Sequence, residues 1–161
     1  EVKLYLSQKQ VERAIRFCEL RESSPIAYII MKGLETINNP HSDTKEAVES
    51  AARSELRKLE KNLGTLSTFA AIAPLIGFLG TVTGMVKVFM KIQTTGGGVD
   101  ISLLAGGIWE ALITTIGGLI VGIIAILFYN HLVAKIEDIA SDMENKSIDL
   151  LIDIRRIKNE Q

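Results

Sequence analysis

Two long apolar stretches dominate the pattern of hydrophobic and polar positions along the chain. Residues 66–86 and residues 111–129 contain no charged side chain. The length of each stretch is close to what a helix needs to cross about 30 Å of hydrocarbon, which is about 20 residues. The pattern therefore predicts two membrane-spanning helices. Three glycines at residues 96–98 lie between them and predict a short turn, because glycine loses backbone entropy in a helix.

Polar helical patterns flank both apolar stretches. Asp43 stands where a helix N-cap is expected, and neither proline nor glycine follows until Gly64, so we expect one helix from about Thr44 to about Lys91. After the second apolar stretch, an apolar stripe at helical spacing predicts a long helix that requires a helical neighbour. The stripe consists of Ile136, Ala140, Met143, Ser147, Leu150, Ile154 and Ile157.

The start of the chain has the pattern of short helices. Residues 8–20 place apolar side chains at helical spacing, with Ser7 available as N-cap. Ser24 and Pro25 then predict the N-cap and first residue of another helix, since proline is preorganised for the first helical turn.

Basic residues predict the orientation of the spans, because lysine and arginine are enriched on the cytoplasmic side of a membrane. They precede the first span at Arg53, Arg57, Lys58 and Lys61, and they follow the second at Lys135, Lys146, Arg155, Arg156 and Lys158. The loop between the spans adjoins only Lys87 and Lys91. We therefore expect both ends of the chain to be cytoplasmic and the loop to be periplasmic.

The predicted fold is an all-α integral membrane protein whose long transmembrane helices extend into a cytoplasmic helical domain. The expected parts are cytoplasmic short helices over residues 1–43, a long helix over 44–91 with its span at about 66–88, a short periplasmic loop over 92–101, a second span over 102–130 and a cytoplasmic helix over 131–161. Because the chain begins at Glu1 rather than at a methionine, we also expect a transmembrane span upstream that this chain lacks.

Charge and motif content exclude several function classes. The formal net charge is −1, and no basic stripe with interleaved aromatic residues is present, which argues against a nucleic-acid partner. The glycines at residues 96–98 are not followed by the lysine and hydroxyl residue of a phosphate-binding loop. No pattern of a nucleophile with its base, and no cluster with metal-ligand spacing, stands out. We therefore predict that the protein is not an enzyme and needs no cofactor or metal.

Small residues in the spans predict close helix packing. Gly80 and Gly84 form one GxxxG pattern, Gly118 and Gly122 form another, and Gly77 shares the face of the first. Such faces let helix backbones approach closely in lipid. We expect that neither these faces nor the apolar stripe of the last helix is satisfied in a monomer, and we predict an oligomeric ring.

Polar side chains at membrane depth are the candidate functional groups. Four threonines carry hydroxyl groups of this kind: Thr81, Thr83, Thr114 and Thr115. A threonine in a membrane helix, however, often donates a hydrogen bond to the backbone carbonyl one turn earlier. Glu110 is harder to accommodate, because a charge at the bilayer centre costs about 2.5–3.5 kcal/mol. Two interpretations stay open: Glu110 belongs to a proton path or its gate, or it is a protonated strut that bonds a neighbouring helix.

The two spans carry a resemblance to the ExbB/TolQ/MotA proton-channel family, and to its ExbB branch most of all. The matching segments are "APLIGFLGTVTGM" at residues 73–85 and "GIWEALITTIGGL" at residues 107–119. The residues that match at the spacing of the family are Pro74, Gly77, Gly80, Thr81, Gly84, Glu110, Thr115 and Gly118. Trp109 departs from the pattern, since it is bulkier than the usual neighbour of the glutamate.

The resemblance implies a subunit of an energy-transducing motor in the bacterial inner membrane. It implies a pentamer around a dimer of a single-span ExbD-like partner, with a TonB-like protein that uses the proton motive force for outer-membrane import. Thr81 and Thr115 would line the pore opposite the partner's aspartate, and Glu110 would be the intramembrane glutamate of the proton pathway. Further pore-lining or packing positions would be Pro74, Gly77, Gly80, Gly84, Thr114 and Gly118.

Other functions remain as alternatives. A TolQ-like motor for envelope constriction has the same core, whereas a MotA-like stator fits less well because its soluble part between the spans is large and charged. A non-conducting membrane scaffold, in which Glu110 only fixes helix register, is a different class. Proton flux in liposomes that contain the partner separates a channel from a scaffold.

Overall fold

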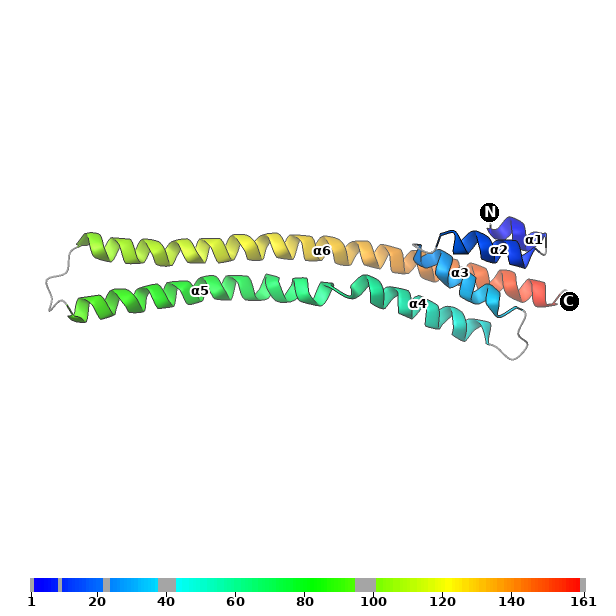
Figure 1. Ribbon diagram of the computed structural model, residues 1–161, viewed down its shortest axis with the longest axis horizontal. Helices are drawn as coiled ribbons and strands as arrows, with labels where there is room; N and C mark the ends of the chain where they lie inside the picture. The colour runs from blue at the N-terminus through cyan, green and yellow to red at the C-terminus, as the bar shows by residue number, and fades with distance from the viewer. Residues whose placement is uncertain (1, 9, 22–23, 38–42, 95–100, 160–161) are drawn as a thin grey trace. The chain divides into compact units, whose positions relative to one another are not determined.

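The computed structural model is all-helical over the residues that it describes, which are the whole chain except 1, 9, 22–23, 38–42, 95–100 and 160–161 (Figure 1). The helices are α1 (Val2–Ser7), α2 (Val11–Glu19), α3 (Pro25–Glu35), α4 (Thr44–Glu60), α5 (Leu63–Thr94) and α6 (Ile101–Asn159). The chain divides into two compact units. One unit comprises Glu1–Lys61 and Ala134–Gln161, and the other comprises Asn62–Val133.

Two helices begin at the residues that the sequence indicates. Ser24 is the N-cap of α3 and Pro25 is its first residue. Asp43 is the N-cap of α4, and its carboxylate accepts a hydrogen bond of 2.9 Å from the backbone N–H of Lys45. This bond satisfies one of the amide groups that have no partner inside a helix at its N-terminus.

Other boundaries differ from the prediction. The expected helix over residues 8–20 is α2, which begins at Val11 with Gln10 as N-cap, and α1 precedes it. The helix expected from about Thr44 to about Lys91 is interrupted by a turn at Lys61 and Asn62. Asparagine and the nearby Gly64 are poor helix formers, which explains why the break occurs there. The predicted glycine turn at residues 96–98 lies outside the described residues.

The first unit has a core built around the apolar stripe of α6. Met143, Leu150 and Ile154 are at most 4% exposed. They belong to one cluster of buried side chains with Leu6, Ala14, Ile29, Leu34, Ile37, Val48, Ala51 and Ile157. The expectation that this stripe needs another chain was therefore wrong, because α1, α3 and α4 of the same chain contribute to the cluster.

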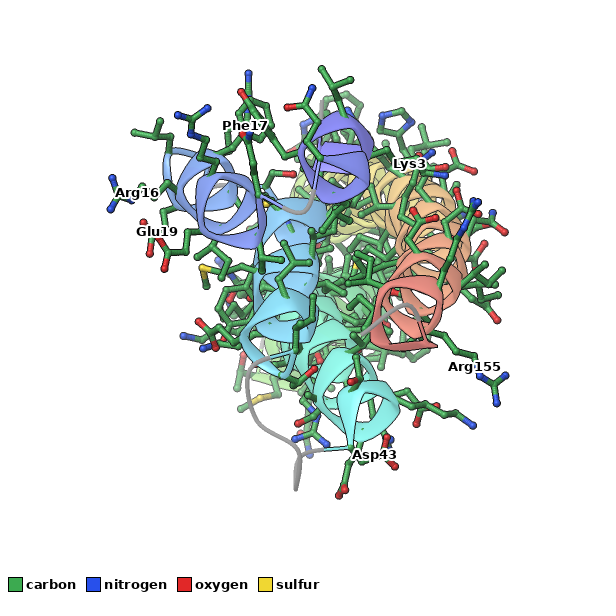
Figure 2. The ribbon with its side chains drawn as sticks, turned by 90° about the vertical axis from the view of Figure 1, so that its right-hand side faces the viewer. Lys3, Arg16, Phe17, Glu19, Asp43 and Arg155 are labelled. Carbon is green, nitrogen blue, oxygen red and sulfur yellow. The ribbon has the colours of Figure 1, made fainter. Side chains whose placement is uncertain are left out.

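Charged side chains surround this core and tie its first helix to its last. In the end-on view, the labelled side chains of Arg16, Glu19 and Arg155 point outward from the helices (Figure 2). The Lys3 ammonium of α1 donates a hydrogen bond of 3.0 Å to the Asp149 carboxylate of α6. The short α1 is thus held by an ion pair and by burial of Leu6, rather than by its own length.

The second unit has the surface of a membrane protein. The chain contains two helices that are long and apolar enough to cross a membrane, within Thr44–Thr94 and Leu104–Ile157. Only 6% and 11% of their most apolar parts are buried in the chain, so they are not core helices of a soluble protein. Large apolar side chains such as Leu75, Phe78 and Leu127 are instead exposed, which requires lipid or another chain to cover them.

Candidate functional site

A seam of small residues joins α5 to the first part of α6. A methyl group on Gly118 would lie 2.6 Å from the Ala73 carbonyl oxygen and 2.7 Å from the Gly77 Cα. A methyl group on Gly77 would lie 3.0 Å from the Thr114 carbonyl oxygen. Neither position has room for a side chain, so the two backbones touch here. The prediction of close glycine packing is confirmed, but it is satisfied within one chain and does not by itself require a ring.

The seam also fixes how the two antiparallel helices are aligned. Pro74 packs on Gly122 near one end, and Gly77 packs on Gly118. Towards the loop, positions 80, 84 and 88 of α5 meet Thr114, Ala111 and Gly107 of α6. Of these, Ala111 and Gly107 were not predicted as packing residues. Their spacing of four residues, which continues to Thr115, is the signal that identifies them.

Three of the four membrane threonines bond their own helix. Thr81 donates to the Phe78 carbonyl at 2.6 Å, Thr83 to Leu79 at 2.7 Å and Thr114 to Ala111 at 2.7 Å. Thr115 differs, because its hydroxyl crosses the seam and donates to the Gly77 carbonyl of α5 at 3.0 Å. This bond joins the two spans at the level where their backbones are closest.

The hydroxyls of Thr81 and Thr115 therefore have a defined chemical capacity. A threonine hydroxyl has one proton to donate and two lone pairs that accept. Both protons are already donated to backbone carbonyls. In this arrangement each oxygen can accept a hydrogen bond from a further group, and it can donate one only after its own bond breaks.

The structure does not bring Glu110 together with these threonines. Glu110 is exposed, and within the described residues its carboxylate has no hydrogen bond or ion pair. Residues in an α-helix are about 100° apart, so Glu110 and Thr115 point to sides of α6 that differ by about 140°. Trp109 is 67% exposed and thus does not enclose Glu110 from within the chain.

Glu110 also lies nearer the loop than the middle of the span. Because Gly84 packs on Ala111, Met85 and Glu110 are level with each other. Residues 63–86 of α5 and 111–134 of α6 contain no Asp, Glu, Lys or Arg, so Glu110 stands at the loop-side end of the stretch in which both helices are uncharged. The cost of its charge is accordingly below the about 2.5–3.5 kcal/mol that applies at the centre of a bilayer.

No group of three or more His, Cys, Asp and Glu side chains is placed to hold a metal ion among the residues that the structure describes. The features of the second unit are instead those of a polar seam between two apolar helices. The Thr114 and Thr115 hydroxyls lie at the contact, and among the described residues of this unit the one carboxylate, that of Glu110, lies on one side of it.

Comparison with known proteins gives this hairpin a family. Residues 21–145 match the MotA/TolQ/ExbB proton channel family. An ExbB homologue of Methanothermobacter thermautotrophicus is 34% identical over 115 residues, which cover 71% of this chain and 40% of that protein. The biopolymer transport protein ExbB of Xanthomonas campestris is 36% identical over 106 residues, which cover 62% of this chain and 42% of that protein.

A third relative belongs to another branch. The Tol-Pal system protein TolQ of Haemophilus influenzae is 35% identical over 102 residues, covering 63% of this chain and 44% of that protein. The chain thus spans about two fifths of the length of these relatives. The family is one of membrane channels and not of enzymes. With its residues 21–145 matched and its two apolar helices packed as a hairpin, this chain belongs to the MotA/TolQ/ExbB proton channel family.

Proposed function

We propose that this chain is part of a proton-conducting subunit of an ExbB-like motor, which uses the proton motive force to power outer-membrane import. The observation that carries this proposal is the pair of threonine hydroxyls at membrane depth, Thr81 on α5 and Thr115 at the seam, inside a hairpin that belongs to a proton-channel family. Two relatives are named as ExbB proteins, which favours this branch.

The assembly around the hairpin follows from the family resemblance. We infer a pentameric ring in the bacterial inner membrane, with both ends of the chain in the cytoplasm and residues 92–101 in the periplasm. An ExbD-like partner dimer occupies the pore, and a TonB-like protein receives the motion. The exposed apolar side chains of α5 and α6 supply the surface that lipid and neighbouring subunits cover.

The threonines give the partner's carboxyl group a contact that depends on its protonation state. While its side chain is protonated, an aspartic acid in the pore can donate to the free lone pairs of Thr81 and Thr115. Once ionised, it can only accept, so the hydroxyls must release Phe78 and Gly77 before they can donate to it. A switch requires contacts that differ between its two states, and this pair provides such a difference.

Proton flux tests this proposal. The full-length protein and its partner are reconstituted in liposomes that contain a pH-sensitive dye, and flux is measured under an imposed potential. Thr81→Val with Thr115→Val removes both hydroxyls at nearly constant shape and should lower the flux at least tenfold. Thr83→Val is the matched control and should keep most of the flux, because Thr83 bonds its own helix as Thr81 does but lies about 160° away from Thr81 around α5. Equal flux in the two variants would show that the hydroxyls of Thr81 and Thr115 do not conduct.

A TolQ-like role is the second candidate, and the similarity to the TolQ protein of Haemophilus influenzae favours it. Both roles use the same proton path, so liposome flux does not separate them. Complementation does: an ExbB-like protein restores import in cells that lack it, whereas a TolQ-like protein restores envelope constriction. Absence of flux with the ring intact would instead support the non-conducting scaffold.

A further inference from the structure

Lys87 and Glu110 lie at nearly the same depth of the hairpin. Lys87 precedes Val88, which packs on Gly107, and Glu110 precedes Ala111, which packs on Gly84. Lys87 is therefore level with residue 108. With a rise of 1.5 Å per residue, its backbone and that of Glu110 differ by about 3 Å along the helix axes.

The two residues also lie on the same side of the hairpin. Thr114 is one helical turn after Glu110, so these two residues form one row along α6. Gly80 is two turns before Lys87, so these two residues form one row along α5. Gly80 and the Thr114 side chain are in direct contact. The row that carries Lys87 on α5 therefore meets the row that carries Glu110 on α6. Both charged side chains are exposed where the rows run on towards the loop.

Charge and environment favour a pairing between them. Lys87 ends the uncharged part of α5, and Glu110 is the one Asp, Glu, Lys or Arg residue between positions 101 and 134 of α6. Within the described residues, neither side chain forms an ion pair in the arrangement that the structure records. At the edge of a hydrocarbon layer an isolated charge is unfavourable, and a neighbouring opposite charge relieves this. The flexible four-carbon stem of lysine allows its ammonium group to reach across the narrow glycine seam.

We propose that Lys87 is the counter-ion of Glu110, forming an ion pair within each chain on one side of the hairpin at the loop-side edge of the membrane. Lys87 is then a positioning residue, which directs the Glu110 carboxylate along the hairpin surface. The inference rests on the membrane placement of the hairpin but not on proton conduction. Loss of Lys87 should consequently resemble loss of Glu110.

Cross-linking tests the geometry in the assembled protein. In a Cys18→Ala background, Lys87→Cys is combined with Glu110→Cys and treated with a short bis-maleimide. We expect an intrachain link that changes the mobility of the monomer band. The control pair combines Lys87→Cys with Leu112→Cys, since residue 112 is about 160° away from Glu110 around α6. The inference fails if the first pair does not link, links only between chains, or links no better than the control.

Thermal stability in nanodiscs tests the interaction and needs no proton gradient. Lys87→Met and Glu110→Gln should each lower Tm by about 2–4 °C, the shift expected for one polar interaction in a chain of this size. The Tm of the double variant should be no lower than that of the less stable single variant. The charge swap Lys87→Glu with Glu110→Lys should recover part of the lost Tm. The inferred ion pair would be refuted if the Tm losses of the two single variants were additive, or if the charge-swap variant were no more stable than the single variants. A failed flux experiment would leave this result unaffected, so the two proposals are tested separately.

Discussion

Replacing Gly118 with alanine adds one methyl group at the closest approach of the two spans. That methyl would lie 2.6 Å from the Ala73 carbonyl oxygen, and ordinary contacts of this kind begin at 3.4 Å. The nearest atoms belong to the backbone of α5, which cannot rotate out of the way as a side chain can. The helices must therefore move apart, and this also lengthens the 3.0 Å bond from Thr115 to the Gly77 carbonyl.

The neighbouring residue supplies a matched control for this effect. A methyl group on Gly117 would have nothing within 4 Å. Both substitutions gain the same helix propensity, about 1 kcal/mol for glycine to alanine, so the difference between them isolates the clash. Overpacking costs about 1–3 kcal/mol, and each kcal/mol shifts Tm by about 2–4 °C in a chain of this size. Gly118→Ala should thus melt about 2–12 °C below Gly117→Ala.

The assay is thermal unfolding of both variants in the same detergent, followed by the fluorescence of Trp109, the single tryptophan of the chain. Proton flux measured on the same preparations should fall in Gly118→Ala and persist in Gly117→Ala. Equal melting temperatures would refute the reasoning, because they would mean that α5 and α6 do not touch at Gly118. A lower Tm for Gly117→Ala would place the packed face of α6 on the other side.

Three other predictions concern Glu110, the ion pair of Lys3 with Asp149, and the buried Ile154. The glutamine of Glu110→Gln cannot ionise, so this variant should lose gradient-driven import while its assembly stays intact, whereas Glu110→Asp should keep part of the import. Full activity of the Gln variant in a growth assay would show that Glu110 only bonds a neighbouring helix. The hydrogen bond from Lys3 lowers the pKa of Asp149. The pair therefore stabilises the fold at pH values above the ordinary carboxyl pKa, and this stabilisation is lost as the pH falls through the lowered pKa of Asp149. Asp149→Asn should therefore flatten the acid side of a plot of Tm against pH. Ile154→Ala removes a side chain that is 2% exposed and should lower the free energy of unfolding by about 2–5 kcal/mol in chemical denaturation.

Much of this fold can be predicted from the sequence because its strongest signals are long. The two uncharged stretches and the stripe from Ile136 to Ile157 each persist over many turns, and all three lie in helices of the structure. The six-residue α1 leaves no such signal. It depends on burial of Leu6 and on the ion pair with Asp149, which is 146 residues away along the chain.

The sequence predicts close packing of the glycines in the spans but not the geometry around them. Gly77, Gly118 and Thr115 do meet at one seam, as small and hydroxyl residues in a span suggest. Spacing alone shows that Glu110 and Thr115 point in different directions. It cannot show that Glu110 is level with Met85 and close in depth to Lys87, because that alignment depends on which turns of α5 and α6 pack together.

The packing within one chain also limits how several chains can assemble. The seam uses the smallest residues of both spans, and the apolar stripe of α6 is used in the first unit, so neither surface remains for a neighbour. The ring that we propose would therefore be built on the exposed faces of the hairpin, where large apolar side chains and Glu110 lie. Gly118→Ala should accordingly weaken each subunit before it changes the number of subunits. Native mass spectrometry of that variant should show an unaltered assembly, and loss of the ring at temperatures where the subunit is still folded would place Gly118 between chains.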